Sequence, residues 1–147
     1  MGRLRQVPRS DVTDPIVLGM YDLLFGKDVD PVTENKMGTA TGSEGDWWTT
    51  YALSPDIMEH AVAGFVMYRS PNRLVDGVLR ELAQTRIGWS VGSKFVFSQH
   101  VQALRGLNAD PAKIRDIKTW QTSDAYTRTE RAVLAYADSI ALDGGRV

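Results

Sequence analysis

Residues 81–100 of the sequence read ELAQTRIGWSVGSKFVFSQH, and this stretch decides the fold. Apolar residues recur at helical spacing on both sides of a short break at Val91-Gly92, which predicts two helices joined by a tight turn. On a helix that starts near Ser93, positions 93, 96, 97, 100 and 104 share one face. That face reads Ser, Val, Phe, His and Leu, so we expect His100 to point inward among apolar neighbours.

Glu81 and His100 are the pair in this stretch that could do chemistry. Two antiparallel helices joined by a tight turn would bring Glu81 on the first close to His100 on the second. A carboxylate beside an imidazole orients the ring, fixes its tautomer and stabilises the imidazolium that forms on proton uptake. Burial disfavours the charged form of an imidazole, so His100 could act as a base. A core histidine with both ring nitrogens bonded inside the protein is the competing interpretation.

Helices separated by clear breaks account for most of the remaining chain. The predicted helices run from Asp14-Pro15 to Gly26, Ser54-Pro55 to Ser70, Arg73 to about Trp89, Ser93 to Leu107, Asp110-Pro111 to about Trp120, and Thr127 to Leu142. Proline directly after Asp or Ser is typical of a helix start, and Thr127 with Glu130 forms a capping box. The polar segment from Lys27 to Asp46 is predicted to be a long loop. No stretch alternates like a strand, so we expect an all-α fold.

The composition is that of one ordinary globular domain. The chain has 147 residues, 43% hydrophobic and 24% charged, so we expect a single domain over 1–147, with a helix and long loop in 1–46 and a helical core in 47–147. Lys plus Arg number 17 against 18 for Asp plus Glu. This lack of a basic excess argues against nucleic acid as a partner.

The sequence also limits which compartments and which cofactors are expected for the protein. No apolar run approaches the length of a membrane span, and the N-terminus lacks the apolar core of a signal peptide, so we expect a cytoplasmic protein with no membrane partner. There is no cysteine and there are two histidines. These counts remove thiol nucleophiles and disulfides and give little support to a metal site. We expect neither a metal nor an organic cofactor.

Residues 81–100 resemble the core motif of the carboxymuconolactone decarboxylase and alkylhydroperoxidase D superfamily, which in the peroxidase branch has the form E-x11-C-x2-C-x3-H. Glu81 and His100 match the glutamate and the histidine, whereas Ser93 and Val96 stand at the two cysteine positions. The flanking and following helices are similar as well, over roughly residues 54–143. The resemblance implies a compact helical bundle, assembly as a trimer or hexamer, and further helices beyond Val147.

The two replaced cysteines bear directly on the activity. Peroxide reduction needs an oxidisable thiolate and, in this scaffold, a resolving partner. Ser93 cannot form a sulfenic acid and Val96 has no polar side-chain atom. The resemblance therefore favours the decarboxylase branch, which also lacks the cysteine pair.

Substrate contacts are suggested by one arginine and one tryptophan. The resemblance implies basic side chains for a dicarboxylate lactone, and Arg86 takes the position of the family's motif arginine. Arg73, Arg80 and Lys94 are nearby in sequence, although a solvated helix face explains them equally well. Trp48, near the end of the long loop, could cover a pocket for a flat or cyclic substrate. Core or subunit packing of Trp48 is the competing interpretation, and the one we favour.

The leading hypothesis is a cofactor-free lyase or proton-transfer enzyme that acts on a small molecule. His100 would be the general base or acid, Glu81 its orienting partner, Ser93 a hydrogen-bond donor, and Arg86 and Trp48 substrate contacts. A non-catalytic oligomeric binding module on a degenerate peroxidase scaffold is the alternative. Residual peroxidase activity is the third, and the absence of cysteine disfavours it.

Overall fold

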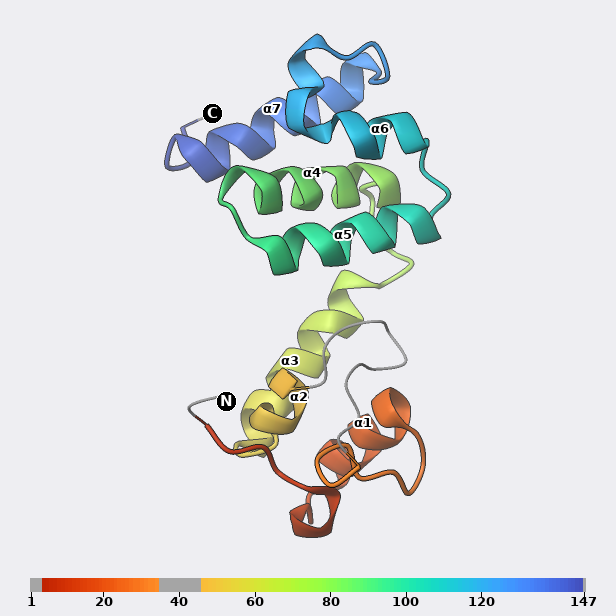
Figure 1. Cartoon of the computed structure of the whole chain (residues 1–147), viewed down its shortest axis with the longest axis vertical. Coiled ribbons are helices and arrows are strands. Elements are labelled where there is room, and N and C mark those ends of the chain that lie inside the picture. The colour runs from red at the N-terminus through yellow and green to blue at the C-terminus, as the bar shows by residue number, and fades with distance from the viewer. Residues whose placement is uncertain (1–3, 35–45, 147) are drawn as a thin grey trace. The chain divides into compact units, whose positions relative to one another are not determined.

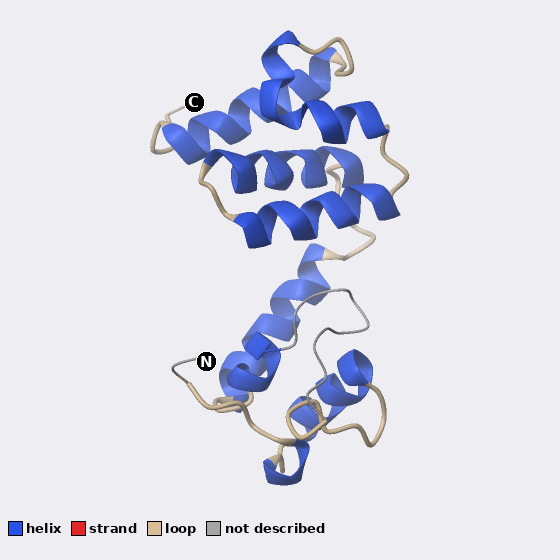
Figure 2. Ribbon diagram, viewed as in Figure 1, coloured by secondary structure: helices blue, strands red, loops and turns tan. Residues whose placement is uncertain are grey.

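The computed structural model of the chain describes residues 4–34 and 46–146. Every regular element in these ranges is a helix and none is a strand (Figures 1 and 2), which confirms the all-α prediction. Much of the predicted long loop, residues 35–45, and the C-terminal Val147 lie outside the described residues. The chain divides into two compact units, 1–73 and 74–147, which are described one at a time; a single domain over 1–147 stays a prediction.

The first unit is built from α1 (Pro15–Phe25), α2 (Asp46–Tyr51) and α3 (Pro55–Tyr68), preceded by a single 3-10 turn, Arg9–Asp11. Asp14 caps α1 by accepting hydrogen bonds from the backbone N–H groups of Ile16 and Val17, as its position before a proline predicts. The core of the unit consists of Val17, Tyr21, Leu24, Phe25, Trp48 and Met58.

Helix α2 is a difference from the prediction, which placed its residues at the end of the long loop. Its six residues, Asp-Trp-Trp-Thr-Thr-Tyr, have little intrinsic preference for a helix. Burial decides instead: Trp48 and Thr49 are among the buried residues of the first unit, and tertiary packing of this kind overrides local propensity.

The second unit holds α4 (Gly77–Ser90), α5 (Lys94–Gly106), α6 (Pro111–Asp116), the 3-10 segment η2 (Ile117–Thr122) and α7 (Arg128–Leu142). Helix α4 lies between α5 and α7 (Figure 1). The core of the unit consists of Leu82 from α4, Leu104 from α5, Ile117 from η2, Tyr126, and Leu134 from α7. The predicted capping box is confirmed, with Thr127 and Glu130 bonded reciprocally.

Two helix boundaries differ from those predicted. Helix α4 begins at Gly77 and not near Arg73, because the Asp76 carboxylate caps it by accepting from the N–H groups of Val78 and Leu79. Helix α6 ends at Asp116, and the predicted continuation to Trp120 is a 3-10 segment interrupted at Thr119. In both places a local capping or kinking feature shortens a helix that the apolar pattern alone would extend.

Gly88 is where α4 and α5 come closest. A Cβ atom added at Gly88 would lie 2.6 Å from the backbone nitrogen of Phe97, so no other residue fits there without movement of the helices. Next to this contact, the Ser93 N–H donates to the Gly88 carbonyl at 2.9 Å. The α4–α5 turn is therefore fixed by backbone contact, and its geometry sets which side chains of the two helices meet.

Candidate functional site

The α4–α5 pair brings Glu81 and His100 into direct contact. Oε2 of Glu81 lies 2.7 Å from Nδ1 of His100. The Glu81 side chain is 3% exposed, whereas that of His100 is 21% exposed. The contact is thus made by a buried carboxylate and a partly accessible imidazole, which is the juxtaposition that the spacing of the two residues predicted.

The contact constrains where the proton of a neutral His100 ring resides. An ionised carboxylate can only accept hydrogen bonds, so if Glu81 is ionised, Nδ1 carries the hydrogen in this contact. The other ring nitrogen, Nε2, then has a lone pair available to accept a proton. Within the described ranges no residue forms a hydrogen bond with Nε2. Whether His100 is a base or a core histidine stays a prediction.

Arg80 is a third member of this group, although from the sequence a solvated helix face explained it as well as a substrate contact did. Its Nε lies 3.2 Å from Oε1 of Glu81, and its NH2 nitrogen lies 3.2 Å from the same oxygen. The two oxygens of the Glu81 carboxylate therefore face different partners, with Arg80 on one and His100 on the other. A guanidinium beside a buried carboxylate favours the ionised form of that carboxylate.

Ser93 lies at the start of the helix that carries His100. Its Oγ accepts a hydrogen bond from the Val96 N–H at 3.3 Å, so it is the N-cap of α5. Seven positions separate it from His100, about 10 Å along a helix axis. Within the described residues its hydroxyl hydrogen has no acceptor. A role as hydrogen-bond donor to a ligand stays a prediction.

Arg86 is bonded inside the second unit. Its Nε and NH2 donate to the two carboxylate oxygens of Asp138 at 2.6 and 3.1 Å. Its NH1 donates to the carbonyls of Ile117 and Lys118, each at 3.0 Å. These contacts join α4 to α7 and to η2 and give Arg86 a structural role. Its suggested contact with a substrate carboxylate stays a prediction that these bonds do not support.

Trp48 lies in the first unit, 4% exposed and in its core. Its ring stacks on that of Trp47, with centroids 4.1 Å apart, and lies 5.5 Å from the ring of Phe65. Within the described residues neither indole N–H has an acceptor. The contacts agree with core packing, the interpretation we favoured, and a role in substrate binding stays a prediction.

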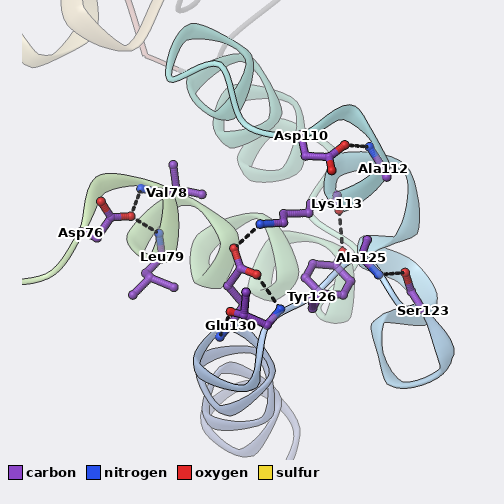
Figure 3. A network of polar contacts seen from close by, with 11 residues as sticks. Asp76, Val78, Leu79, Asp110, Ala112, Lys113, Ser123, Ala125, Tyr126 and Glu130 are labelled. Carbon is purple, nitrogen blue, oxygen red and sulfur yellow. Dashed lines mark hydrogen bonds and ion pairs between the residues drawn. The ribbon is translucent and has the colours of Figure 1, made fainter.

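A polar network ties α6 to the start of α7 (Figure 3). Nζ of Lys113 lies 2.6 Å from Oε1 of Glu130, whose Oε2 accepts from the Thr127 N–H at 2.8 Å. The Tyr126 hydroxyl donates to the Lys113 carbonyl at 2.5 Å. Burial alone would raise the pKa of Glu130, but the hydrogen bonds from Lys113 and Thr127 outweigh burial and hold that pKa below its ordinary value. We interpret the network as structural. Of its contacts, the sequence predicted only the capping box.

An open groove of about 550 Å³ runs between α4 and α7. Its walls are mainly apolar, with Arg80 as the charged member: Val75, Leu79, Arg80, Ala83, Gln84, Thr129, Ala132, Val133 and Tyr136. Glu81, Ser93 and His100 do not line this groove. Arg80 is the residue shared by the groove and the Glu81–His100 pair.

The described residues carry two further findings. They contain no group of three or more His, Cys, Asp or Glu side chains that could hold a metal ion. In the same part of the chain, no helix combines the length and apolar character that crossing a membrane requires.

The chain was compared with protein families, curated proteins and solved structures. A family model described as "Carboxymuconolactone decarboxylase family" matches residues 55–139, a segment that includes Glu81, Ser93 and His100. No curated protein matches the chain, and no solved structure does.

Proposed function

The chain belongs to the carboxymuconolactone decarboxylase family, whose model covers more than half of its residues, and we propose that it is a cofactor-free lyase or proton-transfer enzyme acting on a small carboxylated or cyclic metabolite. The observation that carries the proposal is the 2.7 Å contact between buried Glu81 and partly exposed His100. Enzymes commonly use a carboxylate–imidazole pair of this kind to transfer protons near neutral pH.

In the proposed mechanism His100 is the residue that handles the proton. For proton transfer, Nε2 takes a proton from one carbon of the substrate and returns it to another. For decarboxylation, Nε2 of the neutral ring first takes the proton of the substrate carboxyl group; CO2 then leaves, its bonding electron pair stays on the substrate carbon, and the imidazolium returns the Nε2 proton to that carbon and becomes neutral again. Glu81 orients the ring in both cases and stabilises its positive charge. Ser93 is proposed as a hydrogen-bond donor to the substrate.

We further propose that the protein is cytoplasmic and works as a homo-oligomer, a trimer or hexamer. The support is an apolar stretch on α3, residues 63–67, all of which are exposed. Within it Phe65 is 39%, Val66 68% and Met67 59% exposed. Contiguous apolar surface of this kind is typical of an interface between proteins.

The same apolar stretch favours a second candidate function, a non-catalytic assembly or binding module. In that case the Glu81–His100 pair would only stabilise the α4–α5 packing. Thiol peroxidase activity is a poorer candidate than either, because the chain has no cysteine and the reaction needs a thiolate.

Substitution of His100 by Gln separates the two main candidates. Carboxymuconolactone, named in the family description, is the first substrate to test, with CO2 release and deuterium incorporation from D2O as the readouts. Gln keeps the size and part of the hydrogen bonding but cannot take up a proton. We expect turnover to fall by about 10²–10⁴-fold, the usual contribution of a general acid or base, with little change in melting temperature.

His60→Gln is the matched control, because His60 is the other histidine and is exposed on α3. It should leave turnover unchanged. A variant at His100 that melts at a lower temperature with wild-type turnover would end the catalytic proposal. Absence of CO2 release and of deuterium uptake in the wild type, over a panel of carboxylated lactones, would favour the assembly module.

A further inference from the structure

Arg80 joins the groove between α4 and α7 to the Glu81–His100 pair. It lines the groove, yet its guanidinium turns back to Glu81, its neighbour in sequence, and places both Nε and NH2 3.2 Å from Oε1. Side chains at successive helix positions point about 100° apart around the axis and do not normally face each other. The contact is therefore a specific arrangement and not a consequence of sequence adjacency.

The Arg80 contact determines what Glu81 can do for His100. The last side-chain torsion of a glutamate has a broad range, so contacts to its two oxygens help to fix the orientation of the carboxylate. Here Oε1 contacts Arg80, and Oε2 contacts Nδ1 of His100. Glu81 is only 3% exposed, and its charge would be costly without a cationic partner.

We propose that Arg80 is a positioning residue of the site: by holding Glu81 ionised and in one orientation, it keeps the hydrogen of the neutral His100 ring on Nδ1 and leaves Nε2 to exchange protons with a substrate. The inference deepens the proposed function and rests on it for its catalytic meaning. The geometric part, control of the His100 tautomer through Glu81, is testable without any substrate.

The test is nitrogen NMR of the whole chain, labelled with 15N, at a pH where the His100 ring is neutral. Ring nitrogen shifts and long-range couplings distinguish Nδ1–H from Nε2–H rings. The wild type should show His100 as the Nδ1–H tautomer. Arg80→Met should convert this single pattern into a mixture or into the Nε2–H form, which is the commoner form of a free imidazole.

Arg80→Lys tests the mechanism of positioning. Both Arg80 contacts go to the same oxygen, so a single ammonium can replace them in part, and Lys should restore the Nδ1–H pattern that Met loses. Arg105→Met is the matched control, because Arg105 is exposed on α5, the helix of His100, and it should leave the pattern unchanged. The His60 signal, assigned with His60→Gln, provides an internal reference, and thermal melts show that each variant is folded.

The outcomes separate this inference from the proposed function. An unchanged Nδ1–H pattern in folded Arg80→Met would overturn the role of Arg80, whatever the turnover. If the tautomer pattern changes in Arg80→Met but the wild type is inactive on every carboxylated lactone, Arg80 still positions Glu81, and the proposed enzymatic activity is refuted. If the wild type is active, Arg80→Met should lower kcat on the order of ten-fold with little change in KM, as is usual for partners that orient a reacting group. A change in KM alone would contradict positioning.

Discussion

The carboxylate of Asp138 accepts hydrogen bonds from three side chains: Arg86, Trp120 and Ser90. Burial alone would raise the pKa of Asp138, but these hydrogen bonds outweigh burial and hold that pKa below its ordinary value of 3.8. A carboxyl group with a lowered pKa in the folded state stabilises that state wherever it is ionised. The stability of the contact between α4 and α7 therefore depends on pH through the ionisation of Asp138.

The expected pH dependence follows from the direction of that shift. The stabilisation from Asp138 should be fully present above the pKa of the unfolded state, near 3.8, and should be lost as the pH falls through the lower folded pKa. Asp138→Asn should cost about 2 kcal/mol at neutral pH, the usual contribution of hydrogen bonds to a charged group. Its free energy of unfolding should then fall less steeply below about pH 4 than that of the wild type.

Urea titrations at several pH values, followed by circular dichroism, measure both effects. Asp124→Asn removes an exposed carboxylate of the same unit and is the control for the loss of one charge. Parallel curves for the wild type and Asp138→Asn across the acid range would show that Asp138 does not carry this dependence.

Single residues also show where prediction from sequence ended. The spacing of Glu81 and His100 on two helices joined by a tight turn allowed their contact to be predicted, with support from the resemblance of residues 81–100 to a family motif. The partner of Arg86 could not be predicted. A motif arginine that binds a substrate cannot be distinguished in sequence from one that binds Asp138, 52 positions away. The role of Arg80 was hidden for a related reason, since the direction of a long side chain is set by tertiary contacts and not by its position in a helix.

At the scale of the elements, the packing of α4 on α5 depends on the absence of a side chain at Gly88. Gly88→Ala would place a Cβ 2.6 Å from the Phe97 nitrogen and 3.0 Å from its Cα. Backbone cannot yield as a flexible side chain can, so the helices must separate. We expect a cost of about 1–3 kcal/mol, the range found for overpacked cores, and a lengthened contact between Glu81 and His100.

Gly106→Ala is the matched control, because Gly106 ends α5 and a Cβ there meets nothing within 4 Å. It should be neutral or stabilising by up to about 1 kcal/mol, as expected when alanine replaces an unconstrained helical glycine. Thermal and urea unfolding compare the two variants. A Gly88→Ala protein as stable as Gly106→Ala would contradict the close approach of the helices.

Helices were predictable where their ends carry chemical signals. The helices predicted to start at Asp14, Asp110 and Thr127 do so, and the side chain of each of these residues caps its helix. Ser54, another predicted start, forms no side-chain capping bond. The predictions failed where packing or a kink decides the backbone, as in α2, whose aromatic residues are helical because they are buried, and in η2, which is interrupted at Thr119. The burial of α2 and the kink in η2 both depend on tertiary contacts, so residue type and spacing could not predict them.

At the scale of the whole molecule, the apolar stretch on α3 remains exposed, although Phe65 in it contacts Trp47 and Trp48. Met58 is the buried residue of this helix, although most of its side chains are apolar. Helices that are apolar on most of their circumference are usually covered on most of it. A second copy of the chain is the partner that we propose, and the surface of residues 63–67 is where the test should be made.

Val66→Glu tests this interface, because Val66 is 68% exposed and a charge there costs little if water covers it. In sedimentation at micromolar concentration we expect the wild type to be a trimer or hexamer and Val66→Glu to shift toward smaller species, since an interface buries this position away from water and an unpaired buried charge is strongly unfavourable. Gln102→Glu adds the same charge at an exposed position on α5 and should leave the assembly intact. A monomeric wild type would contradict assembly altogether, whereas an oligomer that survives Val66→Glu would place the interface on another surface.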